Sequence, residues 1–218
     1  MLGLFVALSA LFRFFPEIDL WAASLFYEPG RGFFAPTNWW LAIPYRGMPI
    51  LAQTVALVLL AGWAGSFVVQ RWQSIRKTFG FLLAAAIIGP HLIVGIGLKE
   101  NVGRARPANI VEFGGTQTFT PAYVLSDQCK KNCAFVSAHV ASASFLMAFG
   151  WLGVPAVRRR WLLAGAGLAA VLGLARMLQG GHFLSDVVLP YFFVYGGMWI
   201  TEWLFGQFNW LPKPSSQG

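Results

Sequence analysis

Three short stretches of the sequence carry side chains suited to phosphate chemistry: "KENVGRARP" (99–107), "VSAH" (136–139) and "RMLQGGHFLSD" (176–186). Lys99, Arg106 and Arg176 supply three cations, and the two arginines have planar donor forks that match the oxygens of a phosphate. These residues predict an anion-binding site.

The same stretches contain groups that can transfer a phosphoryl group. His182 and Asp186 are four residues apart, so at the start of a helix they would share a face. A carboxylate that accepts one ring N–H leaves the other nitrogen free to attack, which makes His182 the predicted nucleophile. His139 is the predicted general acid, and Ser137 with nearby backbone N–H groups is expected to bind phosphoryl oxygens. Because this reaction depends on positioning and charge stabilisation, three cations can take the place of a metal, and no metal or other cofactor is expected.

Composition indicates that membrane helices position these groups. Of 218 residues, 57% are hydrophobic and 11% are charged, whereas a soluble domain carries about 25% charged residues. A span needs about 20 apolar residues. We therefore expect an all-α, polytopic membrane protein, a bundle of six transmembrane helices that forms a single domain over residues 1–218, with spans near Leu2–Phe15, Met48–Gln70, Thr78–Leu98, Cys133–Val157, Trp161–Met177 and Asp186–Phe208.

Basic loops predict the orientation of this bundle. By the positive-inside rule, "RWQSIRK" (71–77) and "RRR" (158–160) are cytoplasmic, as are both termini, and the three chemical stretches then share the opposite, exported face. Ionisable groups this close to hydrocarbon are costly and usually functional. Snorkelling to headgroups would account for a single arginine, but not for two histidines and an aspartate.

Other charged and sulfur-bearing residues have simpler interpretations. Cys129 and Cys133 lie in the exported loop, where they are expected to form a disulfide, with two reduced thiols as the alternative; a zinc site is not expected. Arg104 is assigned to a second anionic group of the substrate or to the headgroup layer. The net charge of +8 suits anionic lipids as partners rather than nucleic acid.

The three stretches resemble the motifs of the type 2 phosphatidic acid phosphatase (PAP2) superfamily, K-x6-RP, PSGH and SR-x5-H-x3-D. The resemblance implies that His182 forms a phosphohistidine, that Asp186 orients it and that His139 is the general acid. It further implies phosphate binding by Lys99, Arg106, Ser137 and Arg176. The sequence departs from the pattern at three positions, Val136, Ala138 and Ala175, which removes a hydroxyl and some backbone freedom but no titrating group.

A narrower resemblance lies outside the motifs. "FPEIDLWAASLFY" (15–27), "SDQCKKNC" (126–133) and "RMLQGGHFLSDVV" (176–188) are similar to the lipid A 4′-phosphatases of Gram-negative inner membranes. That resemblance implies removal of the 4′-phosphate of lipid A at the periplasmic face of the inner membrane.

Several alternatives stay open at the level of sequence. A lipid A 1-phosphatase, an undecaprenyl pyrophosphate phosphatase or a phosphatidylglycerophosphate phosphatase would share the same catalytic residues. A lipid transporter would instead place its ionisable groups near the bilayer midplane, often at internal repeats, and no repeat is visible. A structural membrane protein with a decayed site would not be expected to keep every catalytic residue.

Overall fold

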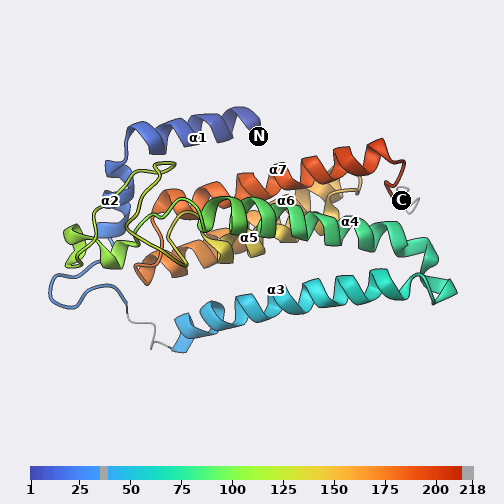
Figure 1. Cartoon of the computed structure of the whole chain (residues 1–218), viewed down its shortest axis with the longest axis horizontal. Coiled ribbons are helices and arrows are strands. Elements are labelled where there is room, and N and C mark those ends of the chain that lie inside the picture. Colours follow the sequence, from blue (N-terminus) through green and yellow to red (C-terminus); the bar gives the residue numbers. More distant parts are fainter. Residues whose placement is uncertain (35–38, 213–218) are drawn as a thin grey trace.

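The computed structural model describes residues 1–34 and 39–212, and in these residues the regular elements are all helical (Figure 1). The long helices are α1 (Leu2–Phe14), α3 (Trp39–Gly65), α4 (Arg76–Ala86) continued by the π-helix η2 (Ile87–Lys99), α6 (Pro155–Leu178) and α7 (Leu184–Gln207). Shorter elements are α2 (Glu17–Ser24), η1 (Gln70–Ile75), η3 (Pro107–Asn109), η4 (Val111–Phe113), α5 (Ala138–Ser144) and η5 (Phe145–Gly150). The predicted all-α class is confirmed for the described residues.

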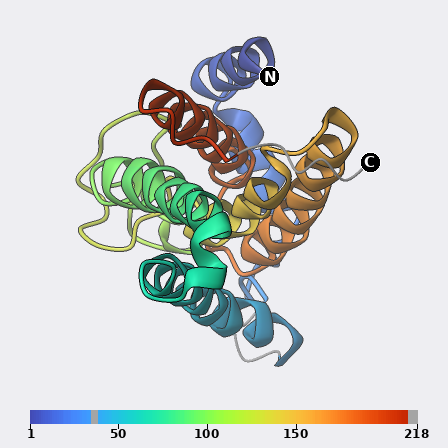
Figure 2. The same ribbon diagram turned by 90° about the vertical axis from the view of Figure 1, so that its right-hand side faces the viewer.

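The long helices run back and forth along one direction, α2 runs across it at one end, and α1 lies on the outside of the bundle beside α7 (Figures 1 and 2). Three helical segments are long and apolar enough to cross a membrane: Leu41–Gly65, Gln70–Lys99 and Pro155–Leu178. Two shorter apolar helices cover Leu2–Phe14 and Ala138–Gly150. Helix α7 is as long as α6, but it is not among these segments.

Three of the predicted spans have different bounds in the structure. The span predicted from Trp161 begins as α6 at Pro155, so "RRR" (158–160), expected in a loop, is helical. Helix α3 begins at Trp39 rather than Met48 and ends at Gly65 rather than Gln70. In the predicted span 133–157, the helical part covers only Ala138–Gly150, because residues 133–137 are non-helical and hydrogen-bond to other loops and to α7. The non-helical residues belong to the site described below.

Close packing between η2 and α7 brings two parts of the site together. A Cβ atom on Gly197 would lie 2.6 Å from the Cα of Gly89, so the two helices can approach this closely only with glycine at that crossing. Pro90 lies inside η2, where it lacks an N–H and disturbs α-helical pairing, consistent with the π-helical register of that segment. The end of η2 at Lys99 and the start of α7 therefore lie at the same end of the bundle (Figure 1).

Candidate active site

The residues that the sequence singles out meet at one end of the bundle, where η2 and α6 end and α5 and α7 begin (Figure 1). A cavity of about 470 Å³ lies there. Its lining includes both candidate histidines, all three candidate cations and three residues of α3. The lining residues are Tyr45, Arg46 and Pro49 from α3, and Lys99, Arg106, Asn132, Ala138, His139, Arg176 and His182 from the rest of the chain. Ser137 and Asp186 are fully buried behind this lining.

The ring of His182 is held in one tautomer. Its Nδ1 lies 2.7 Å from the carbonyl oxygen of Ala134, and because a carbonyl oxygen only accepts, Nδ1 carries the hydrogen and Nε2 the lone pair. Burial lowers the pKa of His182 well below its usual value, and the nearby charges of Lys99, Arg176 and Arg106 lower it further. The ring is therefore neutral near pH 7, as a nucleophile must be.

Asp186 does not accept a hydrogen bond from His182, which corrects the expectation from sequence. Its nearest carboxylate oxygen lies 4.0 Å from His182 Nδ1, beyond hydrogen-bonding distance. His182 precedes α7, which begins at Leu184, so the two residues do not share a helical face as their spacing suggested. The carboxylate instead accepts the backbone N–H of Phe183 at 2.8 Å and forms a 2.7 Å ion pair with Arg104.

Arg104 is an internal residue, so its assignment to substrate or headgroups was wrong. Its side chain is fully buried between Asp186 and Asp19, with a 2.8 Å ion pair to Asp19. Its Nε donates to the Thr120 carbonyl, and its guanidinium lies 4.3 Å from the ring centre of Phe183. Burial opposes the charge of Arg104, but the two carboxylates outweigh it, and its pKa is raised. This cluster fixes α2 and the start of α7 to the loop that follows η2.

Sequence reasoning missed Asp19. It is fully buried in α2, where its Oδ1 accepts the backbone N–H of Ser185 at 2.8 Å, and its Oδ2, which also pairs with Arg104, accepts the Ser185 hydroxyl at 2.6 Å. The available signal was an acidic residue within the apolar stretch "IDLWAASLF". A carboxylate flanked by apolar residues needs a buried partner, but the sequence does not identify which cation supplies it.

The phosphate-binding candidates differ in how much of their hydrogen-bonding capacity is used. Lys99 donates to the Cys133 carbonyl at 2.7 Å, and Arg106 donates twice to the Asn132 carbonyl, at 3.2 and 2.7 Å. Arg176 donates to the side chain of Gln179, whereas its Nε and the hydroxyl of Ser137 are buried without a hydrogen-bond partner. Unpaired buried polar groups are costly, so both atoms are suited to receive the oxygens of a bound anion.

His139 is held by α3. Its Nε2 donates to the carbonyl oxygen of Tyr45 at 2.9 Å, and its ring stacks on the Tyr45 ring with centroids 5.5 Å apart. That carbonyl is free because the residue four positions on is Pro49, which has no N–H to donate. The Arg176 guanidinium lies 4.7 Å from the centre of the same Tyr45 ring. Tyr45 thus contacts both a candidate acid and a candidate phosphate ligand, a role that the sequence did not indicate.

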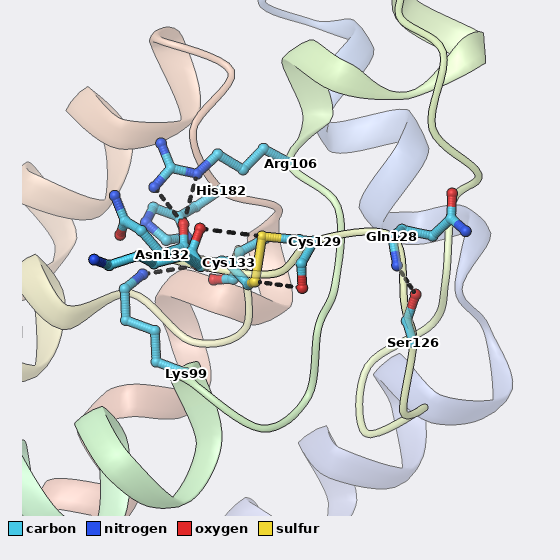
Figure 3. The surroundings of a disulfide bond; sticks show 10 residues. Lys99, Arg106, Ser126, Gln128, Cys129, Asn132, Cys133 and His182 are labelled. Carbon is cyan, nitrogen blue, oxygen red and sulfur yellow. Dashed lines mark hydrogen bonds between the residues drawn. A yellow bond between two sulfur atoms is a disulfide. The ribbon is translucent and has the colours of Figure 1, made fainter.

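Cys129 and Cys133 form a disulfide beside the cavity (Figure 3). The bond closes a turn in which Asn132 adopts a left-handed conformation (φ 56°), which asparagine tolerates better than most residues. In the described part of the chain, no group of His, Cys, Asp and Glu side chains is arranged to hold a metal ion.

Comparison with known proteins agrees with this chemistry. Residues 77–210 match the model of the PAP2 superfamily. The chain is 35% identical to a lipid A 4′-phosphatase of Francisella tularensis subsp. novicida, over 92% of this chain and 93% of the relative. It is also 35% identical to a lipid A 4′-phosphatase of Rhizobium leguminosarum (84% and 85% of the two chains) and 32% identical to one of Rhizobium etli (84% and 77%). No solved structure matches the chain.

The matched residues 77–210 include all three motif stretches. They also include both histidines and all three cations that line the cavity. The relatives extend the similarity to most of the chain, 92% of it for the Francisella protein. From the family match and these relatives, the chain is a phosphoric monoester hydrolase and belongs to the PAP2 superfamily.

Proposed function

We propose that this protein removes a phosphate monoester from lipid A, at the 4′ position, on the periplasmic face of a bacterial inner membrane. The substrate class rests on the relatives, each of which is a lipid A 4′-phosphatase. The observation that carries the proposal is the placement of His182: a buried, neutral ring with a free Nε2, in a cavity that Lys99, Arg106 and Arg176 also line.

In the proposed reaction, a phosphate of the lipid binds between the three cations, with the Ser137 hydroxyl and Arg176 Nε taking phosphoryl oxygens. His182 Nε2 attacks phosphorus, the bond from phosphorus to the sugar oxygen breaks, and His139 gives that oxygen a proton. Water then attacks the phosphohistidine, His139 takes the proton, and inorganic phosphate leaves. Asp186, 4.0 Å from the ring, stabilises the positive charge that the ring acquires in the intermediate.

The same geometry supports the proposed division of the histidines. In the resting site the Nε2–H of His139 is bound to the Tyr45 carbonyl, so Nδ1 is the nitrogen that can gain and release a proton. His182 has the opposite arrangement, with Nδ1–H bound and Nε2 free. Each ring is fixed by a backbone carbonyl, so each keeps one nitrogen for chemistry. No metal or other cofactor enters any step.

For the membrane, we propose six spans: the three long apolar segments, the two shorter ones, and α7. The basic clusters support the orientation. "RWQSIRK" joins α3 to α4 and "RRR" lies in the first turns of α6, both at the end of the bundle opposite the cavity (Figure 1). With those clusters cytoplasmic, the cavity faces the periplasm, where it can reach lipids of the outer leaflet of the inner membrane.

One assay tests the substrate and the chemistry together. Purified protein in detergent is incubated with lipid A, its 1-dephospho and 4′-dephospho forms, undecaprenyl pyrophosphate and phosphatidylglycerophosphate, with and without a chelator, and products are identified by mass. We expect lipid A and its 1-dephospho form each to lose one phosphate, the 4′-dephospho form to be inert, and chelation to have no effect. Turnover of the 4′-dephospho form, or faster turnover of one of the other two lipids, would overturn the proposed position or substrate.

A further inference from the structure

Three consecutive carbonyl groups hold three side chains of the site. The carbonyl of Asn132 accepts Arg106, that of Cys133 accepts Lys99 at 2.7 Å, and that of Ala134 accepts His182 Nδ1 at 2.7 Å. These side chains come from three places in the chain, and they gather around the segment that carries the disulfide (Figure 3). We call residues 132–134 the carbonyl row.

The disulfide fixes the carbonyl row at its middle residue, Cys133. Cys133 belongs to both features: its sulfur is bonded to Cys129 and its carbonyl binds Lys99. From Cys133 onward, residues 133–137 are fully or almost fully buried, but Asn132, the first residue of the row, and Lys131 before it are exposed. Within the turn itself, the covalent bond restrains where the Asn132 and Cys133 carbonyls point.

A second restraint joins the row to the loop that carries Arg104 and Arg106. The N–H groups of Ser126, Cys129 and Ala134 donate to the carbonyls of Val102, Gly103 and Arg104 at 2.8, 3.0 and 2.9 Å. Gly103 has φ 69°, and a Cβ there would lie 1.8 Å from the Ser126 carbonyl oxygen, so only glycine allows this pairing. The pairing places the row, and the disulfide keeps its exposed end in place.

We propose that the Cys129–Cys133 disulfide is a positioning element of the active site, which sets the carbonyl row on which Arg106, Lys99 and His182 are oriented. The inference rests on the roles assigned to those three side chains under the proposed function. Reducing the bond frees the turn, and the carbonyls shift. The nucleophile and two phosphate ligands are then no longer held in fixed positions relative to one another. A displacement of about 1 Å can lower a rate about 100-fold, so the expected loss in kcat is roughly 10- to 100-fold.

The pH dependence distinguishes positioning from general destabilisation. The groups facing His182 are Lys99 from η2, Arg106 from the loop, Arg176 from α6 and Asp186 from α7, with His139 across the cavity. Burial, the largest cause, and the three cations lower the pKa of His182, whereas the hydrogen bond to the Ala134 carbonyl, the smallest cause, raises it. Loosening the row admits water and moves two cations away, and these changes outweigh the loss of that hydrogen bond. The pKa of His182 then rises, and the acid limb of the pH profile moves to higher pH.

The test compares the oxidised enzyme, the same enzyme reduced by dithiothreitol, and Cys129→Ser/Cys133→Ser. The chain has two cysteines, so the reductant has one target in it. Asp127→Asn, an exposed change in the same loop, is the control and should behave like wild type. An aryl phosphate is the substrate for all forms. Because the substrate titrates in the same way in every experiment, a difference between two pH profiles must come from the enzyme.

We expect the reduced and Ser/Ser forms to show a lower kcat and an acid limb displaced to higher pH, with activity recovered on reoxidation of the reduced form. Equal kcat and equal profiles in fully reduced enzyme, with free thiols verified by alkylation and mass, would overturn the proposal. So would a loss of activity that only follows the amount of folded protein, with an unchanged profile. If the Ser/Ser variant does not fold, reduction and reoxidation of wild type decide. Failure on lipid A with activity on the aryl phosphate would refute the proposed substrate and leave this test intact.

Discussion

Arg104 and Asp186 form a 2.7 Å ion pair in which both side chains are fully buried. The carboxylate that the motif spacing assigned to His182 is thus the partner of an arginine at one of the unspecified positions of the first motif. Asp19 occupies the other side of the same guanidinium at 2.8 Å. One cation lies between two carboxylates, and the three together join α2, the loop after η2 and α7 behind the cavity.

The first prediction concerns Asp19. In Asp19→Asn, Arg104 keeps Asp186 as its counter-ion. The amide, however, cannot satisfy all the donors that Asp19 accepts, from Arg104 and Ser185, and hydrogen bonds to charged groups contribute about 1.5–3 kcal/mol. Asp19→Asn should therefore destabilise the protein by about that amount, although Asp19 does not line the cavity. Glu17→Gln, an exposed change in the same helix, is the control and should have little effect. Unfolding in mixed detergent micelles measures both, and equal stability of the two variants would contradict the internal role of this cluster.

A second prediction follows for the nucleophile. If His182 attacks phosphorus, rapid quench with radiolabelled substrate should leave acid-labile label on wild-type protein and none on His182→Ala. Turnover of that variant should fall by several orders of magnitude, because no other group in the site can replace the nucleophile. His91→Ala is the matched control, since His91 is exposed on η2 and does not line the cavity. Label that persists in His182→Ala would assign the attack to another group.

A third prediction concerns the charge around His182. Burial is the largest cause of the lowered pKa of this ring, and the charge of Lys99 is the next largest. Lys99→Met should raise that pKa, so the neutral ring is lost at higher pH and the acid limb of the rate profile moves upward. Lys77→Met, which removes a cation bound to the Asn209 carbonyl near the carboxyl-terminal end of α7, should leave the limb in place. The displacement is measured from pH–rate profiles recorded with one substrate at constant ionic strength. An acid limb that stays in place or moves to lower pH in Lys99→Met would contradict this prediction.

The sequence predicts much of this site because motif spacing and hydrophobic runs are local properties. Apolar segments locate helices, and charged residues at their ends must lie near the bundle end, so Lys99, His139, Arg176 and His182 could be expected at one face. The partner of Asp186 could not be predicted in this way. A spacing of four residues implies contact only within a helix, and α7 begins after His182.

The carbonyl row could not be predicted from sequence for a different reason. Every residue has a carbonyl group, so nothing in "NCA" (132–134) distinguishes these three oxygens from the others. Their function arises from the direction that the folded backbone gives them. The free carbonyl of Tyr45 is an intermediate case, because Pro49 marks it in the sequence, but only the structure shows that His139 binds it.

A fourth prediction tests the orientation in the membrane. A reporter that is active only in the periplasm should be active when fused after Gly115, in the loop at the cavity end, and silent after Arg159, at the opposite end. The basic residues at 158–160 should hold that end in the cytoplasm. Immunoblots of the fusions control for expression. Activity at Arg159 and silence at Gly115 would place the cavity in the cytoplasm, and the proposed outer-leaflet substrate would be wrong.

The last prediction concerns His139 and the proline that frees its partner. His139→Ala should slow hydrolysis of lipid phosphates by roughly 10²- to 10⁴-fold, the usual size of general acid catalysis, and should affect an aryl phosphate less because its leaving group needs little protonation. Pro49→Ala is a subtler change, because it restores an N–H four residues after Tyr45, which then competes with His139 for the Tyr45 carbonyl.

A hydrogen bond contributes about 1 kcal/mol net, so weakening this one should slow lipid phosphate hydrolysis by roughly five- to ten-fold, again with less effect on the aryl phosphate. Tyr45→Phe keeps both the carbonyl and the ring that stacks on His139, so it should stay near wild type. Single-turnover rates with both substrates measure the leaving-group dependence. An equal loss on both substrates in Pro49→Ala would mean that the proline supports the shape of α3, and that the Tyr45 carbonyl does not control the acid.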